Sequence, residues 1–344
     1  MTEEPEYAPL DAPAAGRRKL VGRIAAALVL LAILATYWAI QIPYFSPGVR
    51  ETDTAGYLIL AERIAHGTPI AVREESLLQY QSHVWVENEA GEVLPKYPPG
   101  LSALMAVGYW VAGENGPYLV SPVCGTLALV GAFLLFCLWM SPFASLCAVA
   151  ALAFNPMFMI YTGYPLAHAA NTCALVWGMF FLWRWQRKPG VFTGIGAGLL
   201  LGVAPTVRPT SAVFAVVVVA AVLIAWWQAW RRRSGWPWLA TVALAVGYAF
   251  FPILHMAYNA IYFGNPLLTG YALSDEQGAF EAKRVLSKVI GVFDRIGADG
   301  LGALFGLGLF GLAIRGGPAD RVLRILWFVP LVVVYGFYYW NAPH

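Results

Sequence analysis

Charged residues are scarce in this chain of 344 residues, of which Asp, Glu, Lys and Arg together make up only 12%. Soluble domains carry about a quarter of their residues as charges, so this composition excludes an ordinary soluble protein. The formal net charge is +3 and no long basic run occurs, so a nucleic-acid partner is not expected. Hydrophobic residues make up 59% of the chain. This is the composition of an integral membrane protein.

Cysteines are also few, and all four lie in apolar stretches: Cys124, Cys137, Cys147 and Cys173. They lack the spacing of metal ligands and are interpreted as small buried hydrophobic residues, not as a disulfide framework. The acids and the histidine between residues 74 and 92 have no fixed ligand spacing either. Solvated loop charge is therefore the favoured interpretation of that segment, and a divalent metal there is possible but unsupported.

Long apolar runs fill most of the chain. The first, from about Leu20 to Ile42, is long enough to cross a bilayer, which takes about 20 residues. Residues 1–19 are predicted to be a cytoplasmic tail, because their acidic lead and the lack of a small-residue cleavage site argue against a signal peptide. Residues 20–340 are predicted to be one all-α membrane domain of about nine transmembrane helices. The later spans are expected at about 117–140, 142–161, 166–185, 190–206, 208–230, 236–262, 301–315 and 322–340.

Polar sequence is concentrated in two long segments, 44–116 and 263–300. If the N-terminus is cytoplasmic, the inner segments hold 13 of the 22 basic residues, whereas the two long segments hold 14 of the 19 acids. This asymmetry places both long segments, and the C-terminus, outside. Leu101 to Ala112 is too short to span and is predicted to be an interfacial or re-entrant helix, because counting it as a span would place Arg231 to Arg233 outside.

The first polar segment places a carboxylate, a cation and a tyrosine near the membrane. Thr54 to His66 has apolar residues at helical spacing, and Asp53 immediately precedes it. Asp53 is interpreted as a helix N-cap, a position that is compatible with accepting a proton from a substrate hydroxyl. The segment closes with Lys96-Tyr97-Pro98-Pro99-Gly100, in which Pro99 can begin a helix. Lys96 is either a solvated charge or a substrate contact.

Other polar residues are predicted at the outer ends of spans. His168 is either an interfacial histidine or a substrate contact. Arg208 either reaches towards lipid headgroups or binds the phosphate of a lipid carrier, whose oxygens match a guanidinium fork. Asn259 and Tyr271 belong to the run Y-N-A-I-Y-F-G-N-P-L-L-T-G-Y at 258–271, either as boundary residues of a loop or as sugar contacts.

Four of these features together resemble the GT-C superfamily of membrane glycosyltransferases, which includes the dolichyl-phosphate-mannose-protein mannosyltransferases and the aminoarabinose transferases. T-D-T-A-G-Y at 52–57 looks like the catalytic first loop of that family, and K-Y-P-P-G at 96–100 looks like its recurrent Tyr-Pro-Pro segment. Arg208-Pro209 and the run at 258–271 resemble two further landmarks, in the expected order.

This resemblance implies an inverting glycosyltransferase that moves a sugar from a polyprenyl-phosphate donor to a lipid, glycan or protein acceptor on the extracytoplasmic face. It implies a location in a bacterial plasma membrane. Asp53 matches the catalytic base of the family, and the expected substrate-binding residues are Lys96, Tyr97, His168, Arg208, Asn259 and Tyr271. Lys96 and Arg208 are the expected phosphate contacts. Because family members commonly continue further, the chain is expected to be a short variant or a fragment.

Helices that pack side by side bring residues of equal depth together. One outward-facing cavity is therefore predicted to be lined by Asp53, Lys96, Tyr97, His168, Arg208 and Asn259. Leu101 to Ala112 would border a groove for the polyprenyl tail. Two alternatives stay open: a transporter or flippase of lipid-linked sugar, and a non-catalytic assembly partner. A transporter typically has ionisable residues at mid-membrane or repeated halves, and neither is evident here.

Overall fold

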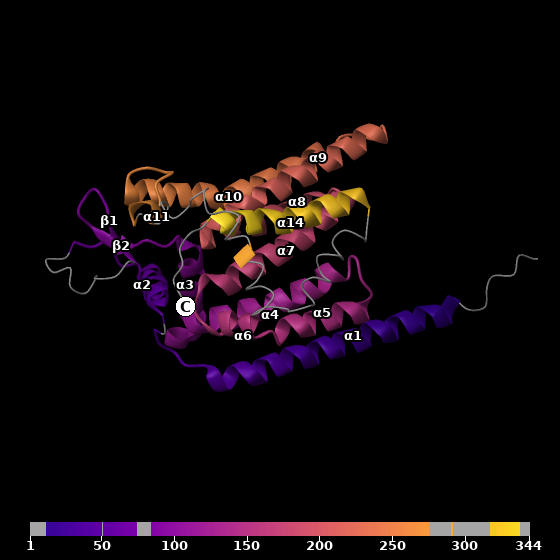
Figure 1. The fold of residues 1–344 in the computed structure, drawn as a ribbon, viewed down its shortest axis with the longest axis horizontal. Coiled ribbons are helices and arrows are strands. Elements are labelled where there is room, and N and C mark those ends of the chain that lie inside the picture. The colour runs from indigo at the N-terminus through magenta and orange to yellow at the C-terminus, as the bar shows by residue number, and fades with distance from the viewer. Residues whose placement is uncertain (1–11, 50, 74–83, 275–289, 292–316, 338–344) are drawn as a thin grey trace, which may run out of the picture.

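The fold is a bundle of long helices with a small cap at one end (Figure 1). The computed structural model describes residues 12–49, 51–73, 84–274, 290–291 and 317–337. The predicted all-α class is confirmed, since one short hairpin is the only sheet among these residues. The bundle helices are α1 (Ala12–Gln41), α4 (Gly116–Phe136), α5 (Pro142–Ala153), α6 (Pro156–Gly163), α7 (Ala167–Arg187), α8 (Val191–Val207), α9 (Ala215–Arg231), α10 (Trp238–Phe263) and α14 (Pro318–Phe337).

Four helical runs in the described residues are long and apolar enough to cross a membrane: Leu20–Tyr44, Pro99–Phe136, Pro209–Arg231 and Trp238–Phe263. The count is five if the bent pair α5 and α6 forms a single span. The chain is therefore a membrane protein. The four or five spans that length and composition identify are fewer than the predicted nine. Of the predicted spans, 301–315 lies outside the described residues.

The predicted span 142–161 is wrong as one straight helix. It consists of α5 and α6, which meet at an angle of 63°. The break lies at Asn155-Pro156, where the Asn155 side-chain oxygen accepts hydrogen bonds from the backbone N–H groups of Met157 (3.0 Å) and Phe158 (3.2 Å). Pro156 supplies no N–H and fits the first turn of a new helix, so this dipeptide ends α5 and begins α6.

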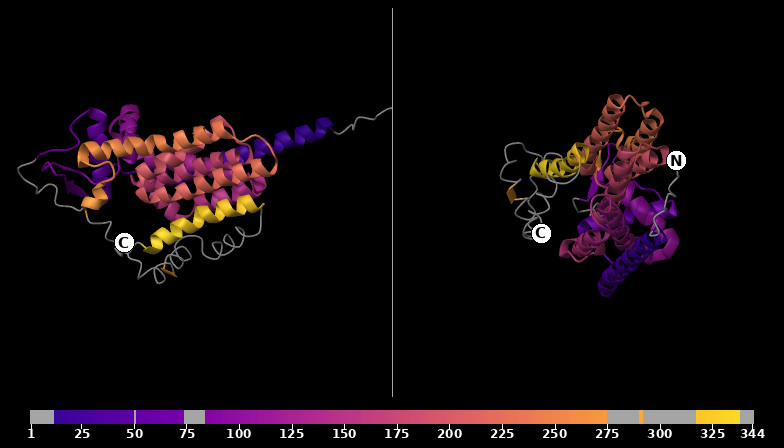
Figure 2. Two further views of the ribbon diagram at one scale, coloured as in Figure 1. Left: turned by 90° about the horizontal axis from the view of Figure 1, so that it is seen from above. Right: turned by 90° about the vertical axis from the view of Figure 1, so that its right-hand side faces the viewer.

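A cap of short elements covers one end of the bundle (Figures 1 and 2). We call it the end cap, and it consists of α2 (Thr52–His66), the hairpin β1 (Trp85–Glu87) and β2 (Val93–Pro95), α3 (Pro99–Ala112) and α11 (Gly270–Leu273). α3 has 14 residues and begins at a pair of prolines. It belongs with α4 to the helical run Pro99–Phe136, so its predicted interfacial or re-entrant position stays a prediction. Its outer side exposes Val107, Trp110 and Val111, which suits a helix lying against lipid.

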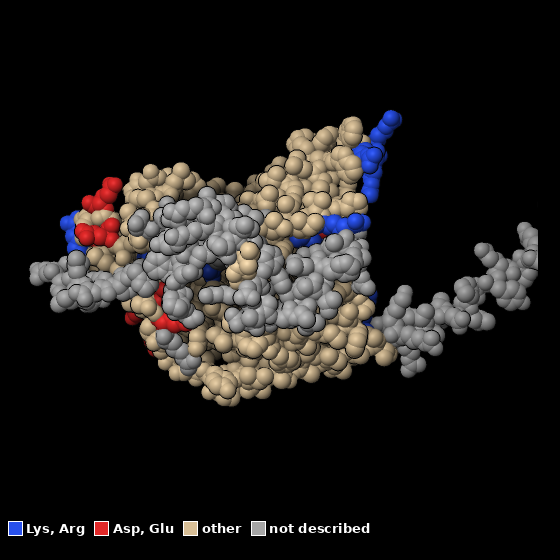
Figure 3. Space-filling model, in the orientation of Figure 1, with Lys and Arg blue, Asp and Glu red and all other residues tan. Residues whose placement is uncertain are grey.

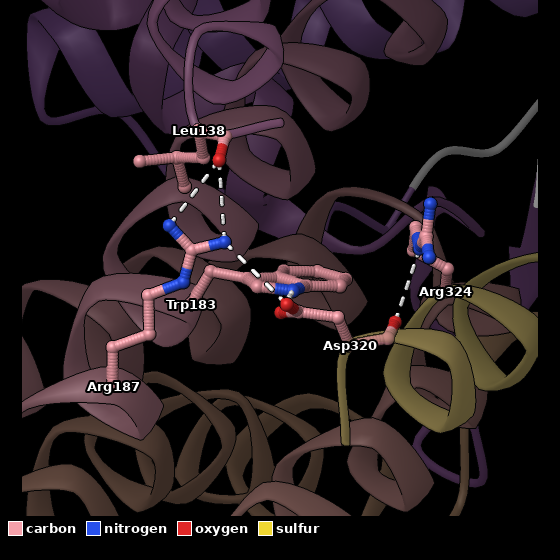
Figure 4. A network of polar contacts seen from close by, with 5 residues as sticks. All are labelled: Leu138, Trp183, Arg187, Asp320 and Arg324. Carbon is pink, nitrogen blue, oxygen red and sulfur yellow. Dashed lines mark hydrogen bonds and ion pairs between the residues drawn. The ribbon is translucent and has the colours of Figure 1, made fainter. Parts of the chain in front are cut away.

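The described part of the bundle is closed at the other end by a polar network that joins α14 to α7 (Figure 4). A carboxylate oxygen of Asp320 accepts a hydrogen bond from Trp183 Nε1 at 3.1 Å, and the other lies 3.6 Å from Arg187 Nη2. Arg187 also donates to the carbonyl oxygen of Leu138, just beyond α4, at 3.3 Å. One acidic residue thereby fixes α14 to α7, since removal of a partly buried charge would leave its partners unsatisfied.

Candidate active site

The candidate site is built around the Lys96-Tyr97 segment, which links β2 to α3. The Lys96 backbone N–H donates to the carbonyl oxygen of Val84 at 2.9 Å, so the segment continues the hairpin. Pro99 occupies the first position of α3, as predicted. Both side chains point into the protein, with Lys96 only 3% exposed and Tyr97 only 2% exposed. Lys96 is therefore not a solvated charge, and that alternative is wrong.

Aromatic rings surround the buried ammonium group of Lys96. Its nitrogen lies 5.4 Å from the ring centroid of Tyr97 and 5.6 Å from that of Tyr271. The Tyr97 ring is 4.3 Å from that of Tyr57 and 6.0 Å from that of Tyr271, which it meets edge-on. Cation–π contacts of this kind stabilise a charge that has lost its water. Lys96, Tyr97 and Tyr271 thus form one unit contributed by distant parts of the sequence.

Asp53 lies next to this unit but is not the helix N-cap that was predicted. α2 begins at Thr52, so the N-cap position belongs to Glu51, whose side chain makes no capping bond, and Asp53 lies in the first turn. A carboxylate there is stabilised by the positive end of the helix dipole. The pKa of Tyr97 is raised far above its ordinary value, first by burial and then by the negative charge of Asp53. The Tyr97 hydroxyl is buried, and Asp53 is the acidic group close enough to act on it.

The glycine of the T-D-T-A-G-Y motif explains why Tyr97 fits so closely against α2. A Cβ atom placed on Gly56 would lie 2.6 Å from Cε2 of Tyr97, which is too short for van der Waals contact. The Tyr97 ring has no room to retreat because Tyr57 and Tyr271 hold its other sides. Gly56 is therefore required for the approach of the tyrosine.

We expect Gly56→Ala to destabilise the protein and Gly22→Ala not to. Alanine improves helix propensity by about 1 kcal/mol at either position, whereas overpacking at Gly56 costs about 1–3 kcal/mol. A Cβ on Gly22 meets nothing within 4 Å. The midpoints of thermal unfolding of the two purified variants check this. Equal midpoints, or a higher midpoint for Gly56→Ala, would show that the Tyr97 ring is free to move.

A second polar pair, Arg208 and His168, lies where α8 ends and α7 begins. Arg208 Nη1 is 2.7 Å from Nδ1 of His168. A guanidinium has only donors, so a ring nitrogen of His168 accepts the bond and the imidazole is neutral. The His168 ring in turn lies 4.3 Å from that of Tyr161 on α6. Three helices thus hold the arginine in one orientation.

Asn171 belongs to the same arrangement and was missed at the sequence level. Its side-chain oxygen accepts a hydrogen bond of 2.8 Å from Ser211 in η4 (Pro209–Phe214), the short helix that follows Arg208. His168 and Asn171 are three residues apart on α7 and therefore share a face. The signal was present in the sequence: two polar side chains at helical spacing at the start of an otherwise apolar span.

One buried apolar cluster connects the two polar groups. It contains Tyr97 together with Ala167 and Val207, the immediate neighbours of His168 and Arg208, and the Tyr271 ring packs against it. A Cβ on Gly100 would meet Thr206 at the end of α8, so α3 rests directly on that helix. The structure therefore brings Asp53, Lys96, Tyr97, Tyr271, His168 and Arg208 to the same end of the bundle. The single cavity that was predicted to join them stays a prediction.

Asn259 lies apart from this group. It is 3% exposed near the end of α10, and its Nδ2 donates to the carbonyl oxygen of Pro266 at 3.2 Å, which stabilises the turn between α10 and α11. The nearby hydrophobic cluster of Val86, Leu94 and Phe263 is separate from the cluster that contains Tyr97. Its Oδ1 is buried and makes no hydrogen bond. No described contact links Asn259 to the Lys96 unit.

Among the described residues no group of three or more His, Cys, Asp and Glu side chains is placed to hold a metal ion. Glu74, Glu75 and His83 lie outside the described residues.

No model of a known protein family matches the chain, and a search of curated proteins finds no match.

Proposed function

We propose that this protein is a GT-C-type glycosyltransferase that moves a sugar from a polyprenyl-phosphate donor to an acceptor hydroxyl or amine. The observation that carries the proposal is the placement of Asp53 beside the buried Lys96-Tyr97 unit, at the same end of a membrane bundle as Arg208 and His168. A carboxylate at the same end of the bundle as two cations suits a reaction in which a base deprotonates the acceptor and cations stabilise an anionic leaving group.

In the proposed reaction the acceptor oxygen attacks the anomeric carbon of the donor while its proton moves to the Asp53 carboxylate. The bond from the anomeric carbon to the phosphate oxygen breaks, and the electron pair leaves on the polyprenyl phosphate, which inverts the sugar. The leaving group is already an anion, so it needs cations more than it needs an acid. Arg208, held by His168, and Lys96 would supply them.

An apolar cavity near the turn between α6 and α7 offers a place for the lipid tail of the donor. Its volume is about 490 Å³, and it lies between the end of α1, η1 (Ile42–Tyr44), α4 and α6. Its wall is mostly apolar and includes Trp38, Phe45 and Ile160. Tyr161, next to Ile160, stacks on His168, which contacts Arg208. We therefore place the tail in this cavity, with the phosphate at Arg208, in preference to the predicted groove along Leu101 to Ala112.

The proposal places the end cap outside the cell. Figure 3 shows acidic side chains together with some basic ones at the capped end, and mostly Lys and Arg at the other end, which agrees with the positive-inside rule for an outer cap. In a background without native cysteines, we expect a membrane-impermeant thiol reagent to label Ala90→Cys, in the hairpin turn, in intact cells. It should label Ser234→Cys, between α9 and α10, only after lysis. The reverse pattern would overturn the topology and, with it, the bacterial extracytoplasmic site.

Purified protein in vesicles distinguishes transfer from transport. We expect label to pass from a radiolabelled polyprenyl-phosphate sugar to an acceptor in the presence of a membrane extract. If the label crosses the vesicle membrane while still bound to its carrier, the protein is a flippase and the transferase proposal fails. If the label neither crosses nor transfers with any of a panel of donor sugars, a non-catalytic role replaces both.

A further inference from the structure

The turn between α9 and α10 has an unusual backbone. α9 ends with the Arg233 N–H donating to Trp230 O (3.1 Å) and the Ser234 N–H donating to Ala229 O (3.0 Å), which is the bond pattern of a Schellman motif. The left-handed position of this motif usually holds glycine, but here it is Arg233, with a φ of 50°. Arg233 is the one non-glycine residue with positive φ among those that the structure describes. A strained arginine, two residues before Gly235, suggests that its side chain is needed there.

This turn borders an open surface pocket of about 520 Å³, a volume within the range of small-ligand sites. Its wall consists of Ala229, Trp230, Arg231, Arg233, Ser234 and Trp236. Two arginines and a serine therefore line this pocket together with two tryptophans. Arg232, which lies between the two arginines in sequence, does not line it.

Neighbouring tryptophans hold the pocket in shape. The Trp226 ring is 5.0 Å from that of Trp236 and 4.5 Å from that of Trp238, and its Nε1 donates to the Thr241 hydroxyl at 3.1 Å. The guanidinium carbon of Arg231 lies 4.7 Å from the ring of Trp227. The wall is thus organised before any ligand arrives, which lowers the entropic cost of binding.

No acidic side chain in the described ranges compensates the charge of the pocket. In the described part of the chain none of Arg231, Arg232 and Arg233 forms an ion pair with an acidic side chain. Figure 3 shows Lys and Arg side chains projecting from the end of the bundle away from the end cap, which is the end where α9 finishes (Figure 1). α9 and α10 both belong to membrane-spanning runs, so the turn between them lies at the level of lipid headgroups. Tryptophan and arginine are both favoured at that level.

We infer that this pocket binds the phosphate of an anionic phospholipid headgroup from the leaflet opposite the end cap. The two arginines would bind the phosphate oxygens, since a guanidinium fork matches them in a bidentate way, and Ser234 would donate a further hydrogen bond. Trp230 and Trp236 would cover the glycerol and the upper acyl chain. The site is independent of the proposed glycosyl transfer and lies at the other end of the molecule.

Native mass spectrometry of the full chain, with phosphatidylglycerol as the probe and phosphatidylcholine as the neutral control, tests this inference. The wild type should retain one phosphatidylglycerol in preference to phosphatidylcholine. Arg233→Gly should weaken this binding at least tenfold. Glycine is favoured in the left-handed position, so the same change should leave the thermal unfolding midpoint unchanged or raise it, and misfolding cannot account for the loss.

Arg232→Gln is the matched control, because it removes the same charge at the same depth without touching the pocket. A general electrostatic effect is about 1 kcal/mol for each basic residue, or roughly fivefold, so Arg232→Gln should lose no more than that. Equal losses in Arg232→Gln and Arg233→Gly would overturn the site in favour of diffuse attraction. If glycerol phosphate in solution competes as strongly as the lipid, the ligand is a soluble phosphate compound and the lipid assignment is wrong.

Discussion

Asp53→Asn is expected to abolish sugar transfer while leaving a folded, membrane-inserted protein. Loss of a general base typically slows a reaction by about 10²–10⁴-fold. Asp53 is half-buried in the first turn of α2 and is not its N-cap, so the helix does not depend on its charge for a capping bond. The favourable interaction with the helix dipole that is lost is worth only about 0.3–1 kcal/mol. Initial rates with a labelled donor, at matched protein levels, measure the effect.

Glu51→Gln is the control for this variant. Glu51 is exposed, lies two residues before Asp53 and makes no capping bond, so its substitution removes one negative charge from the same helix start. We expect its transfer rate to stay within a few-fold of the wild type, roughly the effect of a surface charge. If Asp53→Asn were as active as Glu51→Gln, Asp53 would not be the base, and the catalytic interpretation of the first loop would have to be abandoned.

Arg208→Gln is expected to have the second-largest effect. Removal of one preorganised group that stabilises developing negative charge typically costs about 10²–10³-fold in rate. Glutamine keeps a donor for the ring nitrogen of His168 that lies 2.7 Å from Arg208, so the helix contact is largely preserved while the charge is lost. Arg208→Lys should recover part of the rate, because it restores the charge without the planar fork. Steady-state rates over a range of donor concentrations separate binding from turnover.

Arg73→Gln provides the comparison for the loss of a positive charge. Arg73 is exposed and follows Val72, which pairs with Val93 of the end cap. Its substitution should leave the rate nearly unchanged. An equal loss in both variants would mean that the overall positive potential of this end matters and that Arg208 has no specific role as a phosphate contact.

Local signals in the sequence predicted the ends of several elements. Gly67 ends α2 with a φ of 66°, and Pro99 begins α3. Both ends follow from the residue type alone, because glycine adopts a positive φ without strain and proline is favoured at the first position of a helix. The break at Asn155-Pro156 was equally readable, but the long apolar run around it favoured one continuous span. The start of α2 at Thr52, two residues earlier than predicted, moved Asp53 from a capping position into the helix.

The burial of Lys96 could not be predicted from its neighbours in sequence. It depends on Gly270, whose missing side chain lets α11 lie directly on the Lys96 backbone, and on the rings of Tyr97 and Tyr271. These contacts join residues that are distant in the sequence, so the spacing of hydrophobic residues along the chain does not predict them. The pairing of His168 with Arg208 is of the same kind. Asn259 shows the converse: its place in a polar run suggested a substrate contact, whereas its amide group bonds to its own turn.

Cleavage of the bond between sugar and phosphate tests the proposed chemistry most directly. Purified wild-type protein, mixed in excess with a panel of labelled polyprenyl-phosphate sugars and a membrane extract as acceptor source, should release polyprenyl phosphate from at least one donor in a single turnover. Asp53→Asn at the same concentration should release none on that time scale, and Glu51→Gln should match the wild type. Release by Asp53→Asn at the wild-type rate, or no release by the wild type from any donor, would contradict the assignment of this protein as a glycosyltransferase with an aspartate base.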